Sequence, residues 1–288
     1  MSNNKRTVLI TGCSDGGLGA ALAIAFQKAG LHVYATARDT SKMANLKSLG
    51  IETMALDVLS DSSIAACVKK LSSLDILVNN AGQYYPMTAA DIDIAEAKKA
   101  FDINVWAHIA VTQAFLPLLV KSSDAMIVFN TSAASVVPIP FQVSYNASKA
   151  ALAMFAYNMR FELEPFGIKV IDLRGGLIKS DLVRNMQQSR SHPLPPGSIY
   201  EPARELIEKA MRREGLENEG TPAHEWAGQV VQDLLKKSPP SVIWRGATAL
   251  AARIAAVVPF GLFDGTIRKL NGLDVVGQVI QKASKEQS

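Results

Sequence analysis

The sequence predicts an α/β fold: a single doubly wound parallel sheet with helices on both faces and a C-terminal helical extension. Three observations predict it. Short β-branched runs alternate with helical patterns, a glycine-rich turn joins the first run to a helix, and 288 residues with 48% hydrophobic content suffice for one large core. No internal repeat interrupts the alternation, so we expect one domain over residues 1–240 and the extension over 241–288, packed on the same domain.

Six segments are predicted strands because each is short, apolar and rich in β-branched residues. They are residues 8–10, 32–37, 52–56, 76–78, 126–129 and 169–173. Helical patterns separate them, which requires crossover connections and therefore parallel pairing. The segment 181–220 has few strand signals and many prolines and charges, and we interpret it as a flap over a pocket.

The first predicted strand leads directly into a glycine-rich turn at residues 11–19, and a helix pattern follows over residues 20–29, closed by Gly30. This order is the usual context of a dinucleotide site. Glycines let the backbone approach a pyrophosphate, and the helix N-terminus offers free N–H donors. The alternative is a tight strand-to-helix turn that binds no ligand.

The second predicted strand is followed by Arg38, at the place where an acidic residue would bind the ribose hydroxyls of NAD. An arginine suits a 2′-phosphate through charge-assisted hydrogen bonds, so this residue favours NADP(H) over NAD(H). Lys42 is a candidate for assisting it. The alternative is a solvated arginine at the end of a strand.

Tyr145 and Lys149 are four residues apart on a predicted helix, so they lie on one face of it. A cation near a phenol favours the phenolate, and we expect Lys149 to lower the pKa of Tyr145 toward neutral pH, where it can exchange a proton with an alcohol or ketone. Ser132 follows the strand predicted at residues 126–129. Its place at the carboxyl edge of the sheet allows it to hydrogen-bond a substrate oxygen.

Together these motifs resemble the short-chain dehydrogenase/reductase family from residue 5 to about residue 180. The turn at residues 11–19 resembles the family's cofactor turn, residues 57–58 the pair beside the adenine, and residues 79–82 its central-strand signature. The resemblance implies a Rossmann-type fold in which residues 1–240 are a dinucleotide-binding catalytic domain and 181–220 its substrate flap. It implies four catalytic residues: Asn104, Ser132, Tyr145 and Lys149.

The resemblance also assigns roles. Asn104 holds a water that relays protons, and Lys149 hydrogen-bonds the nicotinamide ribose as well as acting on Tyr145. The implied cofactor-binding residues are Thr11, Gly12, Ser14, Gly17, Leu18, Gly19, Arg38, Asp57, Val58, Asn80, Ala81, Gly82, Tyr145, Lys149, Gly176, Ile178 and Ser180.

The chain departs from the family pattern at two places. The glycine turn has one additional residue, which leaves open whether Gly16 or Gly17 approaches the pyrophosphate. Arg174-Gly175-Gly176 stands where the family commonly has Pro-Gly, so we expect a different shape for the loop beside the nicotinamide.

Within the family, the chain is most similar to the 1-acyldihydroxyacetone-phosphate reductases and related secondary-metabolism ketoreductases, through Gly175-Gly176 and segments 193–200 and 242–246. This likeness implies a hydrophobic ketone or secondary alcohol, lipid-like or from secondary metabolism, as the small-molecule partner. Residues 138–141, Pro-Ile-Pro-Phe, would form an apolar wall. Arg184 and Arg190 are candidate contacts for an acyl phosphate.

Two other function classes stay open. A protein with the same fold could bind NADP(H) without redox chemistry, as a cyclase, an isomerase or a sensor. A lipid ester hydrolase is the second, since Gly12-Cys13-Ser14-Asp15-Gly16 fits a nucleophile elbow with Ser14 as nucleophile. That reading needs a histidine partner, and none of the histidines is a clear one.

Composition excludes several other classes. The net charge of +4 is scattered, which argues against nucleic-acid binding. Cys13 and Cys67 are the only cysteines, and the four histidines lack metal-ligand spacing, so we expect neither a disulfide framework nor a metal site.

The first apolar run is too short for a signal peptide, so we expect an intracellular, cytoplasmic protein, a homodimer or homotetramer. The apolar stretch at residues 247–263 falls short of a membrane span of about 20 residues. We favour its packing over the pocket or at a subunit contact. The alternative is a peripheral contact with an internal membrane or lipid droplet, anchored by Trp244, Arg245, Arg268 and Lys269.

Overall fold

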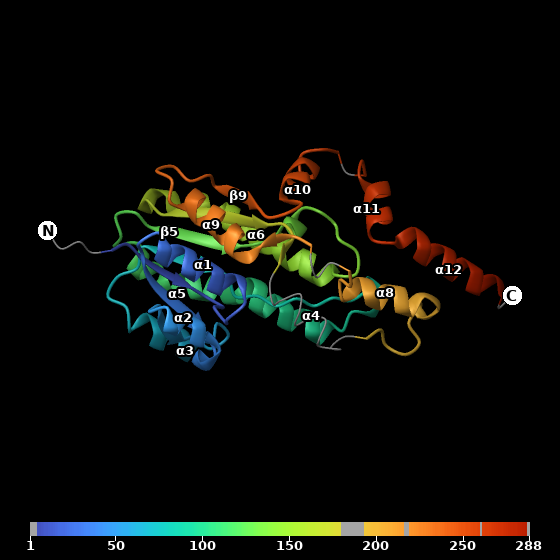
Figure 1. Cartoon of the computed structure of the whole chain (residues 1–288), viewed down its shortest axis with the longest axis horizontal. Coiled ribbons are helices and arrows are strands. Elements are labelled where there is room, and N and C mark those ends of the chain that lie inside the picture. Colours follow the sequence, from blue (N-terminus) through green and yellow to red (C-terminus); the bar gives the residue numbers. More distant parts are fainter. Residues whose placement is uncertain (1–4, 180–192, 216–218, 260, 287–288) are drawn as a thin grey trace.

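A seven-stranded, entirely parallel sheet forms the centre of the computed structural model, which describes residues 5–179, 193–215, 219–259 and 261–286 (Figure 1). The strand order is β3-β2-β1-β4-β5-β6-β9. The strands are β1 (Thr7–Ile10), β2 (His32–Ala37), β3 (Glu52–Ala55), β4 (Ile76–Asn79), β5 (Met126–Asn130), β6 (Lys169–Gly175) and β9 (Val242–Arg245). Because the chain moves outward from β1 to β3 and then crosses to β4, the order reverses between β1 and β4, where such sheets bind ligands.

Helices cover both faces of this sheet. α11 and α12 lie away from the sheet (Figure 1). The helices of the described residues are α1 (Leu18–Lys28), α2 (Ala44–Ser48), α3 (Asp61–Val68), α4 (Ile94–Phe101), α5 (Ala107–Leu119), α6 (Val143–Leu163), α8 (Arg204–Met211), α9 (Ala223–Leu234), α10 (Ala249–Ala255), α11 (Asp264–Leu270) and α12 (Leu273–Glu286). A small separate sheet pairs β7 (Ile178–Lys179) with β8 (Thr221–Pro222).

Alternating strand residues divide the core into two layers. Val8 and Ile10 of β1 pack with α1, α2 and α9 on one face, whereas Leu9 between them packs with α3, α5 and α6 on the other. Both faces are buried, which explains why the central strands are continuously apolar in sequence. The predicted fold class is therefore confirmed.

All six predicted strands are present, and β9 is a seventh that was not predicted. It lies in the segment 241–288, assigned in the sequence to a helical extension, and pairs with β6 through Asp172↔Val242 to Gly175↔Arg245. Only Ile243 of its four residues is buried, because β9 lies at the edge of the sheet, so it lacks the continuous buried run of the inner strands. The helices of the extension begin at α10.

A third apolar cluster lies beside the catalytic edge of the sheet. Ile207 and Met211 of α8 and Val276 of α12 pack there against Tyr85 and Met87 of the loop after β4. Part of the predicted flap is thus an amphipathic helix with a buried face. The predicted residues Ser180, Arg184 and Arg190 lie outside the described residues.

Phe115 of α5 is fully buried and packs within the α3–α5–α6 layer, so its truncation leaves a cavity. We expect Phe115→Ala to lower the free energy of unfolding in urea by about 3–5 kcal/mol. Phe166→Ala is the matched control, because Phe166 is exposed, and it should change that free energy by less than about 0.5 kcal/mol. Equal losses would mean that Phe115 is not a core residue.

Candidate active site

A cavity of about 1780 Å³ lies at the carboxyl ends of β1, β4, β5 and β6. The glycine turn after β1, the loop after β5, the start of α6 and the segment from α10 to α11 line it. Its size exceeds the roughly 300–1,000 Å³ typical of a pocket for one small molecule. The cavity therefore has room for a dinucleotide and a second ligand.

The glycine turn forms one end of this cavity. Gly12 has a left-handed φ of +73°, and a Cβ there would lie 2.9 Å from the Cα of Ala81, so only glycine fits. Of the two glycines left open by the sequence, Gly17 lines the cavity and Gly16 does not. Gly17 is the N-cap of α1 and supplies no side-chain cap. The first N–H groups of α1 are thus left for an anion.

Two of the predicted cofactor residues are buried behind the turn. The Oγ1 of Thr11 accepts hydrogen bonds from the backbone N–H groups of Asn80 and Ala81, both at 2.9 Å. Gly19 packs against the carbonyl oxygen of Gly12 so closely that no Cβ would fit. Neither residue lines the cavity. Their contacts with the backbone fix the shape of the glycine turn, and they do not face the ligand space.

The other predicted cofactor residues line the cavity, except Ser180, which is not among the described residues. These are Gly12, Ser14, Gly17, Leu18, Arg38, Asp57, Val58, Asn80, Ala81, Gly82, Tyr145, Lys149, Gly176 and Ile178. Arg38 is exposed and forms no ion pair with a described residue, so its guanidinium is free to meet a phosphate. The residues present fit a dinucleotide with a 2′-phosphate.

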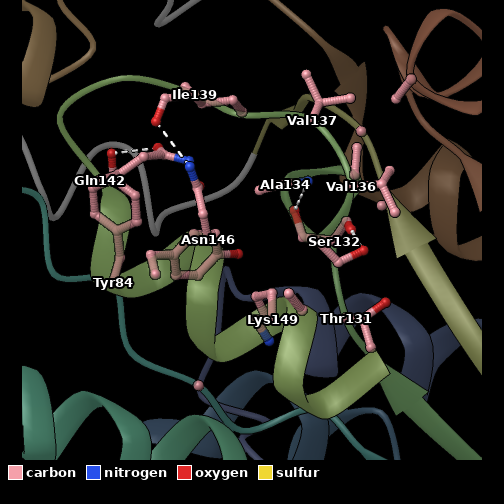
Figure 2. Close-up of a pocket in the computed structure, with 18 of the residues that line it drawn as sticks. Tyr84, Thr131, Ser132, Ala134, Val136, Val137, Ile139, Gln142, Asn146 and Lys149 are labelled. Atoms are coloured by element: carbon pink, nitrogen blue, oxygen red, sulfur yellow. Dashed lines mark hydrogen bonds between the residues drawn. The ribbon is translucent and has the colours of Figure 1, made fainter. Parts of the chain in front are cut away.

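Three of the four predicted catalytic residues meet in the middle of the cavity. Ser132 follows β5 as the N-cap of the short turn Ala133–Ser135, and Tyr145 and Lys149 lie in the first turns of α6. Figure 2 shows Ser132 in the loop and Lys149 on the helix. Ser132 and Tyr145 both line the cavity, and an interaction of the Ser132 hydroxyl with the Tyr145 phenol lowers the pKa of that phenol. Two hydroxyls can therefore bind one substrate oxygen.

Lys149 does not act on Tyr145 as predicted. Its Nζ donates to the carbonyl oxygen of Asn130 at 2.9 Å and lies 5.8 Å from the centre of the Tyr145 ring. Enclosure in the cavity raises the pKa of Tyr145, while the charge of Arg213 and the hydrogen bond from Ser132 lower it. The expected lowering by Lys149 is therefore wrong: the ammonium points to the backbone, and Arg213 is the cation that acts on the phenol.

Asn104, the fourth predicted catalytic residue, lies behind the cavity wall. It sits in a π-helical turn, Asp102–Trp106, between α4 and α5. Its Nδ2 donates to Gln83 O at 2.8 Å and to Ser148 Oγ at 3.0 Å, and its Oδ1 accepts from Gln83 N at 2.7 Å. Such π turns are frequent at functional sites. Here the turn lets Asn104 tie the loop after β4 to the catalytic helix.

Sequence reasoning missed a polar cluster at the substrate end, made by Tyr84, Gln142, Asn146 and Arg213. Gln142 is buried; its Oε1 accepts from Tyr84 Oη and Arg213 Nη2, both at 2.8 Å, and its Nε2 donates to Asn146 Oδ1 at 2.6 Å. Figure 2 shows Tyr84, Gln142 and Asn146 grouped near Ile139. Arg213 was missed because it stands in a run of charges, 212–214, that looks solvated in the sequence.

The described residues contain no cluster of three or more histidine, cysteine, aspartate or glutamate side chains that could hold a metal ion. Within the same ranges, no helix has both the length and the apolar character needed to cross a membrane. Within the apolar stretch 247–263, residues 249–255 form α10, and several of the described residues of the stretch line the cavity, in agreement with the favoured interpretation.

Comparison with known proteins identifies the family. The family model for short chain dehydrogenases matches residues 6–191, more than half of the chain. A short-chain dehydrogenase/reductase of Pestalotiopsis microspora is 54% identical over 283 residues, 98% of this chain and 100% of the relative. The chain belongs to the short-chain dehydrogenase family. The predicted family is confirmed, and with it the oxidoreductase class.

Other relatives within the short-chain dehydrogenases carry more specific names. An NADPH-dependent 1-acyldihydroxyacetone phosphate reductase of Schizosaccharomyces pombe is 34% identical over 277 residues, 92% of this chain and 93% of that protein. Among solved structures, a short-chain dehydrogenase from Streptomyces avermitilis has a TM-score of 0.75 at 24% identity and covers 96% of this chain and 99% of its own. That similarity supports the fold.

The short-chain dehydrogenase assignment weakens the hydrolase interpretation, and so does the geometry around Ser14. Among the described residues, no histidine is hydrogen-bonded to Ser14. His108 is buried, with a ring nitrogen 2.6 Å from Ala81 O, and burial lowers its pKa to about 3. A neutral, enclosed imidazole facing a backbone carbonyl cannot serve Ser14 as a base.

Lys149 gives this short-chain dehydrogenase a pH-dependent stability. Burial lowers its pKa from 10.5 to about 8, so between those values the unfolded chain binds a proton that the folded chain does not. The free energy of unfolding should therefore rise with pH across this window, by about 1.4 kcal/mol per pKa unit of the difference. We expect the rise in chemical denaturation from pH 7.5 to 10 and its loss in Lys149→Met. If the free energy of unfolding of both proteins depended on pH in the same way, Lys149 would not have the lowered pKa that burial gives it.

Proposed function

We propose that the protein is an NADPH-dependent ketoreductase that transfers hydride between NADP(H) and a hydrophobic ketone or secondary alcohol, with Tyr145 as the acid–base. One observation carries the proposal. The side chains of Ser132 and Tyr145 line one cavity and interact there, and the glycine turn forms the other end of that cavity. A carbonyl placed there meets two hydroxyl donors beside a dinucleotide.

The cofactor end supports NADP(H). Arg38 would hold the 2′-phosphate, and the turn through Gly12 and Gly17 would hold the pyrophosphate. The Schizosaccharomyces pombe relative is named as NADPH-dependent. When bound, the nicotinamide supplies or accepts the hydride.

The chain's own residues handle the oxygen and its proton. In the direction of reduction, Tyr145 Oη donates its proton to the carbonyl oxygen while the Ser132 hydroxyl stabilises the negative charge that develops there. Arg213 and Ser132 offset the enclosure that raises the pKa of Tyr145. Asn104 positions α6 through Ser148, and Lys149 reaches toward the ribose from its place beside Asn130.

An apolar substrate suits the rest of the cavity. One wall is made by the predicted residues 138–141, preceded by two valines; the opposite wall is made by α10, α11 and the turn between them, with Ile254, Val258, Phe263, Ile267 and Leu270. Burying a chain between these walls releases water from apolar surface on both sides. A lipid-like or secondary-metabolite ketone fits better than a sugar. Homo-oligomerisation, peripheral contact with a lipid surface and a cytoplasmic location stay predictions.

Tyr145→Phe tests the redox function. Removing one hydroxyl should lower kcat for NADPH-dependent reduction of an acyl dihydroxyacetone phosphate or a long-chain ketone by about 10²–10⁴-fold. The Kd of NADPH, from its fluorescence, should change by less than about threefold. An unchanged kcat would contradict the assignment of Tyr145 as the acid–base. NADPH binding without reduction of any ketone by the unmodified protein would favour the cyclase, isomerase or sensor class.

Arg38→Ala tests the choice of cofactor. Losing charge-assisted hydrogen bonds to the 2′-phosphate should raise the Kd of NADPH about 10–100-fold and leave the Kd of NADH within about threefold. Lys42→Ala is a matched control, since Lys42 does not line the cavity, and it should shift neither value by more than about threefold. A preference for NADH in the unmodified protein would contradict the role of Arg38.

A further inference from the structure

Three cationic side chains line the cavity among the described residues: Arg38, Lys149 and Arg213. Arg38 lies at the cofactor end, and Lys149 lies under the reaction centre against Asn130 O. Arg213 lies at the other end, against the tyrosine and glutamine that flank the substrate space. The reaction proposed for Tyr145 and Ser132 does not require it as a reactant. The presence of a cation beside the neutral polar groups and apolar walls of this half of the cavity needs a separate explanation.

The fold turns Arg213 inward. It follows α8, whose Ile207 and Met211 are buried, and its backbone has a left-handed φ of 53°, an unusual conformation for a residue with a Cβ. Its neighbour Arg212 pairs with Glu208 and Glu214 instead. The two arginines thus face different surroundings, one an acidic cluster and the other the cavity.

Among the described residues, neutral groups alone orient the guanidinium of Arg213. Its Nη2 donates to Gln142 Oε1 at 2.8 Å, and its Cζ lies 5.1 Å from the centre of the Tyr84 ring. Tyr84 and Gln142 are themselves joined by a hydrogen bond, which fixes the two side chains that contact the guanidinium. No carboxylate of a described residue pairs with it. Toward the described residues, Arg213 thus uses one of the five N–H donors of an arginine, and the others can meet further acceptors.

Arg213 is also close to the reacting group. The Tyr84 ring under its guanidinium meets the Tyr145 ring edge-on, with centres 5.2 Å apart. The charge of Arg213 acts on the Tyr145 phenol more strongly than that of any other cation. A planar, fixed guanidinium matches the two oxygens of a carboxylate or phosphate. An anion bound there would lie within a few bonds of a carbonyl held by Tyr145.

We propose that Arg213, held by Tyr84 and Gln142, is a subsite for an oxyanion group, a phosphate or a carboxylate, that the ketone substrate carries near its carbonyl. This inference rests on the proposed ketoreductase function. It assigns the substrate an anionic end at Arg213 and an apolar body between residues 138–141 and α10–α11. Arg213 is a specificity residue in this scheme, since it contacts substrate without taking part in proton or hydride transfer.

Matched substrates and variants test the subsite. Reduction is compared for an acyl dihydroxyacetone phosphate against its dephosphorylated form, and for a β-keto acid against its methyl ester. Arg213→Met should lower kcat for both members alike, because the charge that offsets the raised pKa of Tyr145 is lost. It should lower kcat/KM for the anionic member of one pair by about 10–100-fold more than for the neutral member, mainly through KM. Arg213→Lys should lower kcat/KM for the anionic member less than Arg213→Met does, because lysine keeps the positive charge but not the planar pair of N–H donors. The substrate pair whose anionic member loses more activity shows whether the subsite binds a phosphate or a carboxylate.

Arg212→Met is the control variant, because Arg212 belongs to the same turn but pairs with Glu208 and Glu214. It should leave both pairs of substrates unchanged. Equal losses on anionic and neutral members in Arg213→Met, or no preference for either anion in the unmodified protein, would overturn the subsite while leaving the ketoreductase function intact.

A binding measurement separates failure of the subsite from failure of the proposed function. Hexyl phosphate and hexanoate are titrated calorimetrically into the NADP⁺-saturated protein. One of the two should bind to the unmodified protein and to Arg212→Met, and bind at least about tenfold more weakly to Arg213→Met. If no ketone is reduced but this loss is seen, the proposed function fails and the oxyanion subsite stands. If neither anion binds, the subsite is overturned.

Discussion

A chain of buried and half-buried hydrogen bonds crosses the carboxyl edge of the sheet, and both ends of the active site depend on it. Thr11 Oγ1 holds the backbone of Asn80, Asn80 Nδ2 returns a hydrogen bond to Thr11 O, and Asn130 Nδ2 donates to Asn80 Oδ1. Asn130 O then accepts from Lys149 Nζ. One connected network therefore fixes the glycine turn of β1 relative to the catalytic helix α6 across β4 and β5. In a water-poor interior each of these groups must be paired, which makes the arrangement specific.

Burial sets the electrostatics of the same region. It raises the pKa of Tyr145 and lowers that of Lys149 to about 8, because both changes favour the uncharged form. The proton transfer proposed for Tyr145 needs an effect that opposes burial, and the Ser132 side chain and the charge of Arg213 both lower the pKa of the phenol. The charge of Asp172 raises the pKa of Lys149 and so opposes the effect of burial there. Asp172 itself forms an ion pair with Arg174 at 2.7 Å. The catalytic groups are thus tuned by partners on β6 and α8 as much as by each other.

Local patterns in the sequence predicted the sheet, the glycine turn and the positions of Ser132, Tyr145 and Lys149, because each depends on a strand, a turn or a helix period that a few adjacent residues encode. Features that depend on tertiary packing were not predictable in this way. Edge strand β9 needed β6 as a partner, the direction of Lys149 Nζ depended on Asn130, and Arg213 was turned inward only by the packing of α8. Gln142 belongs to no motif, yet its burial makes it the centre of the substrate-end cluster.

The residues proposed for the reaction and those proposed for substrate choice come from different parts of the chain. The residues proposed to bind a dinucleotide and handle the carbonyl oxygen come from β1 to β7, within the region that the family model matches. The network from Thr11 to Lys149 joins those of β1 to α6. The residues that would choose the substrate come from α8, α10 and α11, together with the loop at residues 136–142, and are held by the apolar cluster around Ile207 and by Gln142. A change at α10 or α11 can alter the substrate without changing the residues proposed to handle the carbonyl oxygen, whereas a change at Arg213 after α8 would also affect the pKa of Tyr145. This division explains how one catalytic core serves relatives with different substrates.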